Sequence, residues 1–122
     1  MEHATATDLY TQADQQWREA VELDLQSSED IVYAIMPLLA QSLNLEPDYL
    51  PSLDLLSDML MEVGAYDEAV EFAERLHDLA PNEADYERKM TALTGEEQHR
   101  RRLVRAYLRQ KRQRLTGDQT HH

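Results

Sequence analysis

Apolar residues recur along this chain at intervals of three and four, the spacing of amphipathic helices. The pattern predicts a first helix over about 8–25, capped by Thr7, and a second over about 27–43, opened by serine hydroxyl caps. Pro37 stands inside the second pattern. Because proline lacks an N–H and clashes with the preceding turn, we expect a kink or a later helix start there.

Four further helices complete the pattern. The third includes Leu53 and Val63 and ends at Gly64; the fourth runs from about Tyr66 to Pro81; the fifth, capped by Asn82 with Asp85, reaches Leu93; the last runs from Glu96 to about Leu115. Six helices with short connections and no strand predict an all-α fold of stacked antiparallel helical hairpins. We expect one domain over 8–115, with disordered ends at 1–7 and 116–122.

A repeat of about 34 residues is visible in the middle of the chain. Pro47 and Pro81 are 34 residues apart, and each follows an aliphatic helix end. Between them, Gly64-Ala65-Tyr66-Asp67-Glu68-Ala69 supplies a tight turn and a small residue that lets two helices approach closely. The segment 50–83 therefore resembles one tetratricopeptide repeat. Its packing positions are Leu53, Leu56, Ser57 and Leu60.

The flanking segments resemble the same family more weakly. They are 16–47 and 84–115, and the last helix, 96–115, is basic and is expected to cap the stack. The central repeat also departs from the family, since Leu53, Ser57 and Leu60 replace its frequent Trp, Gly and Tyr. The resemblance implies a short right-handed array of about six helices, with three repeats as the physical minimum.

The resemblance also implies a binding surface, because such repeats hold peptides or partner domains in a concave groove lined by the first helix of each repeat. The members that clamp a terminal carboxylate use Lys, Asn and Arg where this chain has Asp54, Leu55 and Asp58, so that clamp is excluded. The groove-facing positions of the central repeat are Pro51, Asp54, Asp58, Met61 and Glu62.

Asp54, Asp58 and Glu62 follow one another at intervals of four and form one acidic row. Two interpretations stay open. The row binds a basic segment of a partner, with Met61 as an adaptable apolar contact, or it is a solvated helix face that keeps the protein soluble. A second row, on the helix after Gly64, is expected on the outer surface in solvent; it consists of Asp67, Glu71, Glu74 and Asp78.

The net charge of −12 is divided unevenly. Residues 1–99 carry 23 acidic and 4 basic side chains, net −19, whereas 100–122 carry 8 basic and 1 acidic, net +7. The last helix combines an apolar stripe, Leu103, Val104, Tyr107, Leu108 and Leu115, with a basic arm, Arg101, Arg102, Arg105, Arg109 and Arg112.

Three interpretations of this helix remain open. It caps the stack; its cations fold back toward Asp54 and Asp58 or bind an acidic protein; or it binds nucleic acid or an anionic membrane. The charge of −19 on the remaining chain repels polyanions, so nucleic acid and membrane are the least favoured partners.

Composition narrows the function further. Without cysteine there is no disulfide or thiolate metal site, the histidines are scattered, and three glycines leave no phosphate loop. We therefore expect no enzyme, cofactor or metal. No apolar run is long enough to span a membrane, and the acidic start does not resemble a signal peptide, so a cytoplasmic location is expected.

Two hypotheses follow. The first is an adaptor or small chaperone that holds a basic or amphipathic segment of a protein partner in the acidic groove. In size, acidity and expected fold the chain is similar to small acidic tetratricopeptide-repeat chaperones of bacterial secretion systems. The alternative is a structural subunit or homo-oligomer, such as a homo-dimer, with the basic C-terminal helix as its contact arm.

Overall fold

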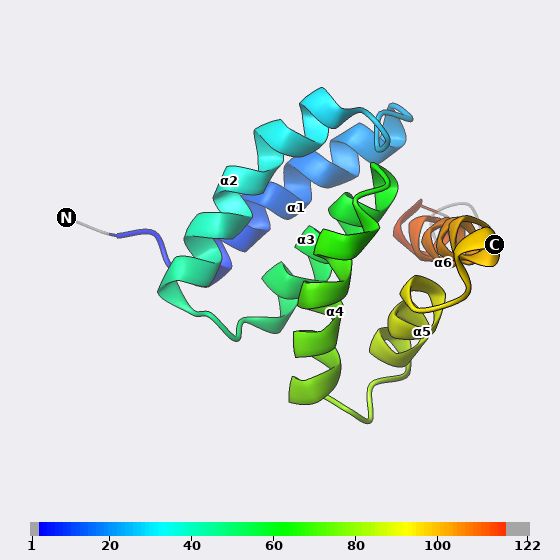
Figure 1. Cartoon of the computed structure of the whole chain (residues 1–122). Helices are drawn as coiled ribbons and strands as arrows, with labels where there is room; N and C mark the ends of the chain where they lie inside the picture. The colour runs from blue at the N-terminus through cyan, green and yellow to red at the C-terminus, as the bar shows by residue number, and fades with distance from the viewer. Residues whose placement is uncertain (1–2, 117–122) are drawn as a thin grey trace, which may run out of the picture.

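A computed structural model describes residues 3–116, and these residues form six α-helices and no strand (Figure 1). The predicted all-α fold is thus confirmed. The helices are α1 (Ala6–Glu22), α2 (Glu29–Leu45), α3 (Leu50–Glu62), α4 (Tyr66–Leu79), α5 (Ala84–Leu93) and α6 (Glu97–Thr116).

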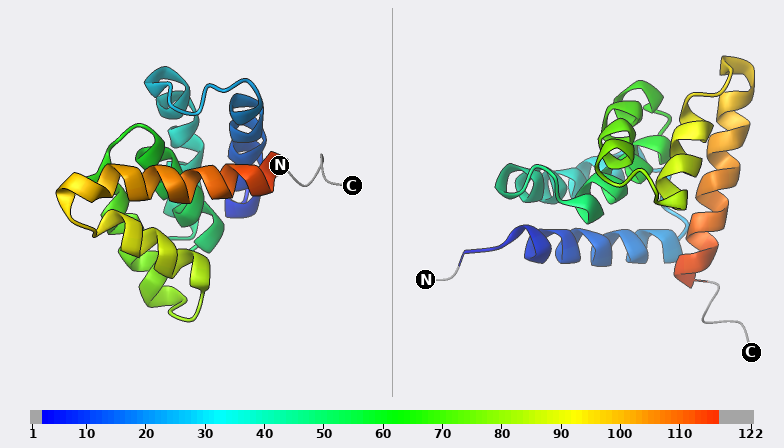
Figure 2. Two further views of the ribbon diagram at one scale, coloured as in Figure 1. Left: turned by 90° about the vertical axis from the view of Figure 1, so that its right-hand side faces the viewer. Right: turned by 90° about the horizontal axis from the view of Figure 1, so that it is seen from below.

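Consecutive helices pack as hairpins, α1 with α2, α3 with α4, and α5 with α6, and the hairpins join through α2 with α3 and α4 with α5. The third pair differs from the first two, because α5 has 10 residues and α6 has 20. Its long second helix returns across the molecule and packs against both α3 and α1 (Figure 2). The inner side of α3 is therefore covered by α6.

Helix α1 begins two residues earlier than expected. Thr5, and not Thr7, is its cap: the Thr5 hydroxyl accepts from the Asp8 amide and the Asp8 carboxylate accepts from the Thr5 amide, each at 3.0 Å. The helix also ends early, at Glu22, because Asp24 adopts a left-handed backbone conformation with φ 59°. Residues 6 and 7 and Thr116, all expected to be disordered, are helical; the rest of the expected tail of 116–122 lies outside the described residues.

Helix α2 runs without interruption through Pro37, so the expected later start is wrong. It begins at Glu29, where the Ser28 hydroxyl accepts from the Ile31 amide. Pro37 is exposed, and so is Tyr33, whose carbonyl loses its helical donor to the proline. Because that carbonyl lies on the exposed side, water can replace the missing hydrogen bond.

The cap expected for the fifth helix is also corrected. Helix α5 is preceded by Glu83, which makes no side-chain capping bond. Asp85 points instead to arginine side chains, Arg88 and Arg114.

The core lies between the hairpins and is mainly aliphatic. Ala69 and Ala73 of α4 are fully buried and permit close packing on α3, and Trp17 of α1, 3% exposed, joins the same cluster as expected. A buried polar contact ties three helices together, since the Ser42 hydroxyl lies 2.7 Å from the Ser52 hydroxyl and donates to the Ala6 carbonyl at 2.9 Å.

Two helix ends share one backbone motif and provide a matched pair of substitutions. Gly64 after α3 and Asp24 after α1 both have positive φ, 80° and 59°, and are followed by the hydrogen bonds of a Schellman motif. We expect Gly64→Ala to lower the free energy of unfolding by about 1–2 kcal/mol, and Asp24→Gly to raise it. Urea unfolding measures both; equal stability of Gly64→Ala and the wild type would contradict the assignment.

Candidate functional site

The acidic row of α3, Asp54, Asp58 and Glu62, points at α6 rather than into solvent. The exposed fractions of the three side chains are 24%, 8% and 7%. Met61, the expected apolar contact beside them, is 2% exposed. The structure therefore brings the four expected partner-binding residues together on one face, which we call the inner face, and covers that face with α6.

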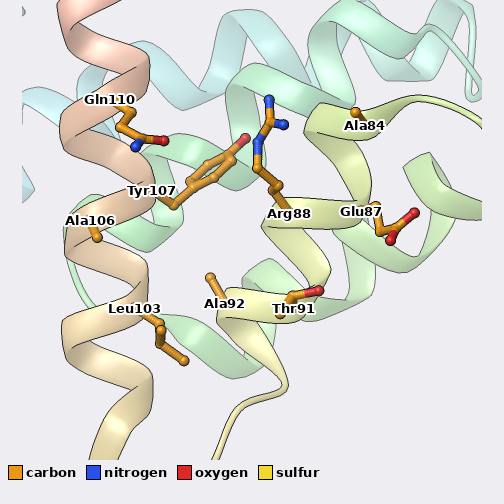
Figure 3. A pocket seen from close by; sticks show the side chains of 9 residues that line it. All are labelled: Ala84, Glu87, Arg88, Thr91, Ala92, Leu103, Ala106, Tyr107 and Gln110. Carbon is orange, nitrogen blue, oxygen red and sulfur yellow. The ribbon is translucent and has the colours of Figure 1, made fainter.

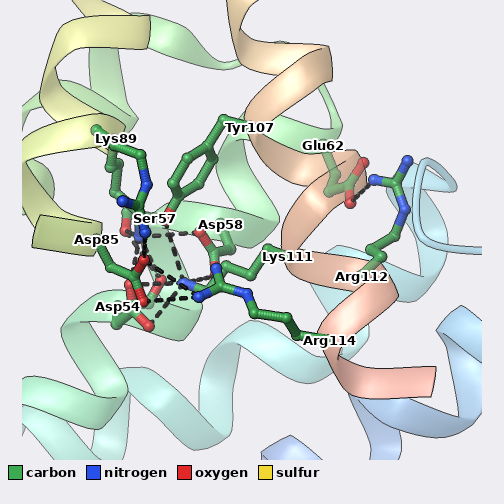
Figure 4. Close-up of polar contacts among 11 residues, drawn as sticks. Asp54, Ser57, Asp58, Glu62, Asp85, Lys89, Tyr107, Lys111, Arg112 and Arg114 are labelled. Carbon is green, nitrogen blue, oxygen red and sulfur yellow. Dashed lines mark hydrogen bonds and ion pairs between the residues drawn. The ribbon is translucent and has the colours of Figure 1, made fainter. Parts of the chain in front are cut away.

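Four side chains form a closed ion cluster at the centre of this contact (Figure 4). Lys89 of α5 places Nζ 2.6 Å from Asp54 Oδ1 and 2.9 Å from Asp58 Oδ1. Lys111 of α6 places Nζ 2.8 Å from Asp54 Oδ2 and 2.6 Å from Asp58 Oδ2. Each ammonium group thus bridges both carboxylates, and the cluster is neutral.

Neighbouring groups add hydrogen bonds to the two lysines of the ion cluster, whereas Asp58 Oδ1 has an ion pair but no hydrogen bond among the described residues. Lys89, whose side chain is 0% exposed, also donates to Ser57 Oγ at 2.6 Å and to the Asp54 carbonyl at 2.9 Å. The Tyr107 ring lies 5.9 Å from Lys89 Nζ and 5.6 Å from Lys111 Nζ, and its hydroxyl accepts from Lys111 at 3.3 Å. Buried ammonium groups are tolerated only with such partners.

The mutual attraction in the cluster outweighs the burial of its charges. Burial would raise the pKa of Asp54, but Lys89 and Lys111 more than compensate and hold this pKa at about 2. Burial would likewise lower the pKa of Lys111, yet the Asp58 and Asp54 carboxylates raise it above its ordinary value. The ionised form of Asp54 and the protonated form of Lys111 are therefore strongly favoured.

Two further ion pairs hold the C-terminal half of α6. Arg112 pairs with Glu62, and Arg114 Nη1 lies 3.1 Å from Asp85 Oδ2 of α5. Burial raises the pKa of Glu62, and the Arg112 guanidinium opposes this effect. All three acids of the acidic row thus have cationic partners on α6.

The apolar stripe of α6 is buried in part. Val104, Tyr107 and Leu108 join the core, whereas Leu103 is 38% exposed. Leu103 lines a pocket of about 400 Å³ between α5 and α6, together with Tyr107 and Ala92 (Figure 3). This burial favours the interpretation of α6 as a capping helix. The contacts of Lys111 with Asp54 and Asp58 also agree with the interpretation in which cations of this helix fold back toward these two residues.

The structure divides the expected basic arm. Arg112 turns inward to Glu62, while four arginines remain exposed: Arg101, Arg102, Arg105 and Arg109. Arg101, Arg105, Arg109 and Arg112 line a cleft of about 960 Å³ with the α1–α2 loop and the end of α3.

Sequence reasoning missed Lys89 and Lys111. Ten of the 12 basic residues are arginine, and the only two lysines both lie in the ion cluster. This bias was the available signal, because the compact ammonium group of lysine has three donors and can bridge two carboxylates.

Within residues 3–116, no group of three or more His, Cys, Asp or Glu side chains is placed to hold a metal ion. In the same range, every helix is too short or too polar to cross a membrane.

Comparisons with known proteins identify no relative: no family model, curated protein or solved structure matches the chain. A functional proposal therefore rests on the fold and on the contact between α3 and α6.

Lys89→Met should destabilise the fold strongly, because it leaves two carboxylates around one ammonium group. We expect a loss of about 3–5 kcal/mol in the free energy of unfolding. The control is Arg88→Met, which removes an exposed pair with Asp85 and should change stability by about 1 kcal/mol or less. Denaturant unfolding compares the two, and similar losses would show that the ion cluster does not support the fold.

Acid should remove the contribution of Asp54. Its pKa is lower in the folded protein, about 2, than its ordinary value of 3.8, so the stabilisation is present above that ordinary value and is lost as the pH falls toward 2. The raised pKa of Glu62 changes stability with pH in the opposite direction. Because Glu62 is present in both the wild type and Asp54→Asn, its effect cancels in the comparison. From about pH 6 to 2, the wild type should lose about 2 kcal/mol more stability than the variant. Parallel pH profiles would contradict this.

Proposed function

We propose that this protein is a non-enzymatic, tetratricopeptide-like adaptor or small chaperone of the cytoplasm whose acidic inner face binds a basic amphipathic helix of a protein partner. One observation carries the proposal: the inner face is occupied by a helix of that kind, α6, held by the ion cluster. The similarity to small acidic secretion chaperones remains an analogy of size, charge and fold.

The contacts of α6 define the ligand that this face accepts. Apolar side chains enter the core at Val104, Tyr107 and Leu108, and the cations that meet the acidic row follow at Lys111 and Arg112. This is the pattern of an amphipathic helix bound in a groove, with anchors at intervals of three and four. A partner helix needs the same order of three apolar anchors followed by two cations.

Helix α6 therefore competes with the partner helix for the inner face. A ligand that binds only when α6 is displaced has an affinity reduced by the small fraction of molecules in that state. The connection between α5 and α6 spans only 94–96 and includes Gly95, so it can serve as the hinge. Weakening the α6 contact should therefore strengthen binding of an external helix.

The test uses a fluorescent peptide of residues 97–115 and the full-length chain. Replacing Lys111 and Arg112 together with Glu sets like charges against the acidic row, and should raise the affinity for the peptide by about tenfold or more over the wild type. The matched control replaces exposed Arg105 and Arg109 with Glu. This control has the same charge change and should bind as the wild type does, as measured by fluorescence anisotropy.

A second variant keeps the test valid if the double substitution unfolds the protein. Arg112→Glu removes the pair with Glu62 and leaves all four side chains of the ion cluster unchanged. If either inward variant keeps its helical circular dichroism and binds the peptide no better than the outward control, the inner face is not a binding site and the proposal is wrong.

A further inference from the structure

The outward side of α6 carries three arginines without a partner among the residues that the structure describes. Arg101, Arg105 and Arg109, which we call the arginine row, follow one another at intervals of four and are exposed. They make no side-chain hydrogen bond or ion pair with any described residue, in contrast to the three cations at the C-terminal end of α6. Glu29 and Asp30 stand elsewhere on the same cleft and make no ion pair with the row.

A complementary row lies on the outer surface of α4. Glu71, Glu74 and Asp78, the outer acidic row, are exposed and have no ion-pair partner within residues 3–116. They border a hollow of about 510 Å³ that also includes Met90 of α5, His77 and Arg75, whose guanidinium group pairs with Asp48. At a rise of about 1.5 Å per residue, the arginine row spans about 12 Å and the outer acidic row about 10 Å.

The two rows cannot meet within one molecule. Helix α6 packs on α5, α3 and α1, and it reaches α4 through Arg100, which pairs with Asp67 at 3.9 Å and lies over the Tyr66 ring at the start of α4. Beyond this end of α4, α5 lies between α4 and α6, so the arginine row does not reach the outer acidic row (Figure 2). A contact between the rows must therefore join two copies, and because the two surfaces differ, it is head to tail.

From this complementarity we propose that the arginine row of one copy docks onto the outer acidic row of a second copy, forming a head-to-tail oligomer. The contact does not depend on the displacement of α6 proposed above, because the arginine row is exposed while α6 is docked. Exposed ion pairs contribute about 1 kcal/mol or less each, so the association is weak and sensitive to salt.

Sedimentation velocity of the full chain at rising protein concentration tests the contact. In about 0.1 M salt, where the Debye length of about 10 Å screens the long-range repulsion between acidic copies, the average mass should rise with concentration. In about 1 M salt it should return to that of the monomer. Replacing Arg105 and Arg109 with Glu, or Glu71 and Glu74 with Arg, should each abolish the association.

Charge reversal provides a specific rescue. An equimolar mixture of the two double variants restores opposite charges at every contact, and so does one chain carrying all four substitutions; both should associate as the wild type does. A wild type that stays monomeric in about 0.1 M salt, or a rescue that fails while the variants keep their helical circular dichroism, overturns the proposal. Capture of a polyglutamate peptide by a monomeric wild type also overturns it and assigns the arginine row to an acidic partner.

Discussion

The ion cluster of Asp54, Asp58, Lys89 and Lys111 is the interaction on which the arrangement of α3, α5 and α6 depends. Its two carboxylates come from α3 and its two ammonium groups from α5 and α6. Because the cluster is buried and neutral only as a whole, removal of any member leaves an unpaired charge with little solvent. The cluster therefore specifies where α5 and α6 lie on α3.

The same contact explains how one chain combines a strongly acidic body with a basic helix. Three like charges at intervals of four along α3 repel one another in an isolated helix. With α6 in place, each has a cation of opposite sign within ion-pair distance. The charge division of −19 and +7 is thus partly an internal pairing, and a partner of the inner face must compete with it.

The helices were predictable because each depends on local periodicity, and Gly64 marked the end of α3. The early end of α1 was not predictable, because Asp24 adopts a left-handed backbone conformation that is usually occupied by glycine. The acidic row was found from spacing alone. Its partner Lys89 was not found, because nothing in the sequence around a lysine on a short helix indicates that it is buried. The contact of Lys89 with Asp54 also joins residues that are 35 positions apart.

A double-mutant cycle between Asp58 and Lys111 tests the central claim most directly, because it isolates their pairwise energy from the effects of each substitution. The cycle uses Asp58→Asn, Lys111→Met and the double variant, with stability measured by denaturant unfolding. We predict a coupling energy of about 1.5–3 kcal/mol, and additive effects for the control pair of Asp58 with exposed Arg105. Additive effects for Asp58 and Lys111 would contradict a fold in which the acidic face of α3 holds α6.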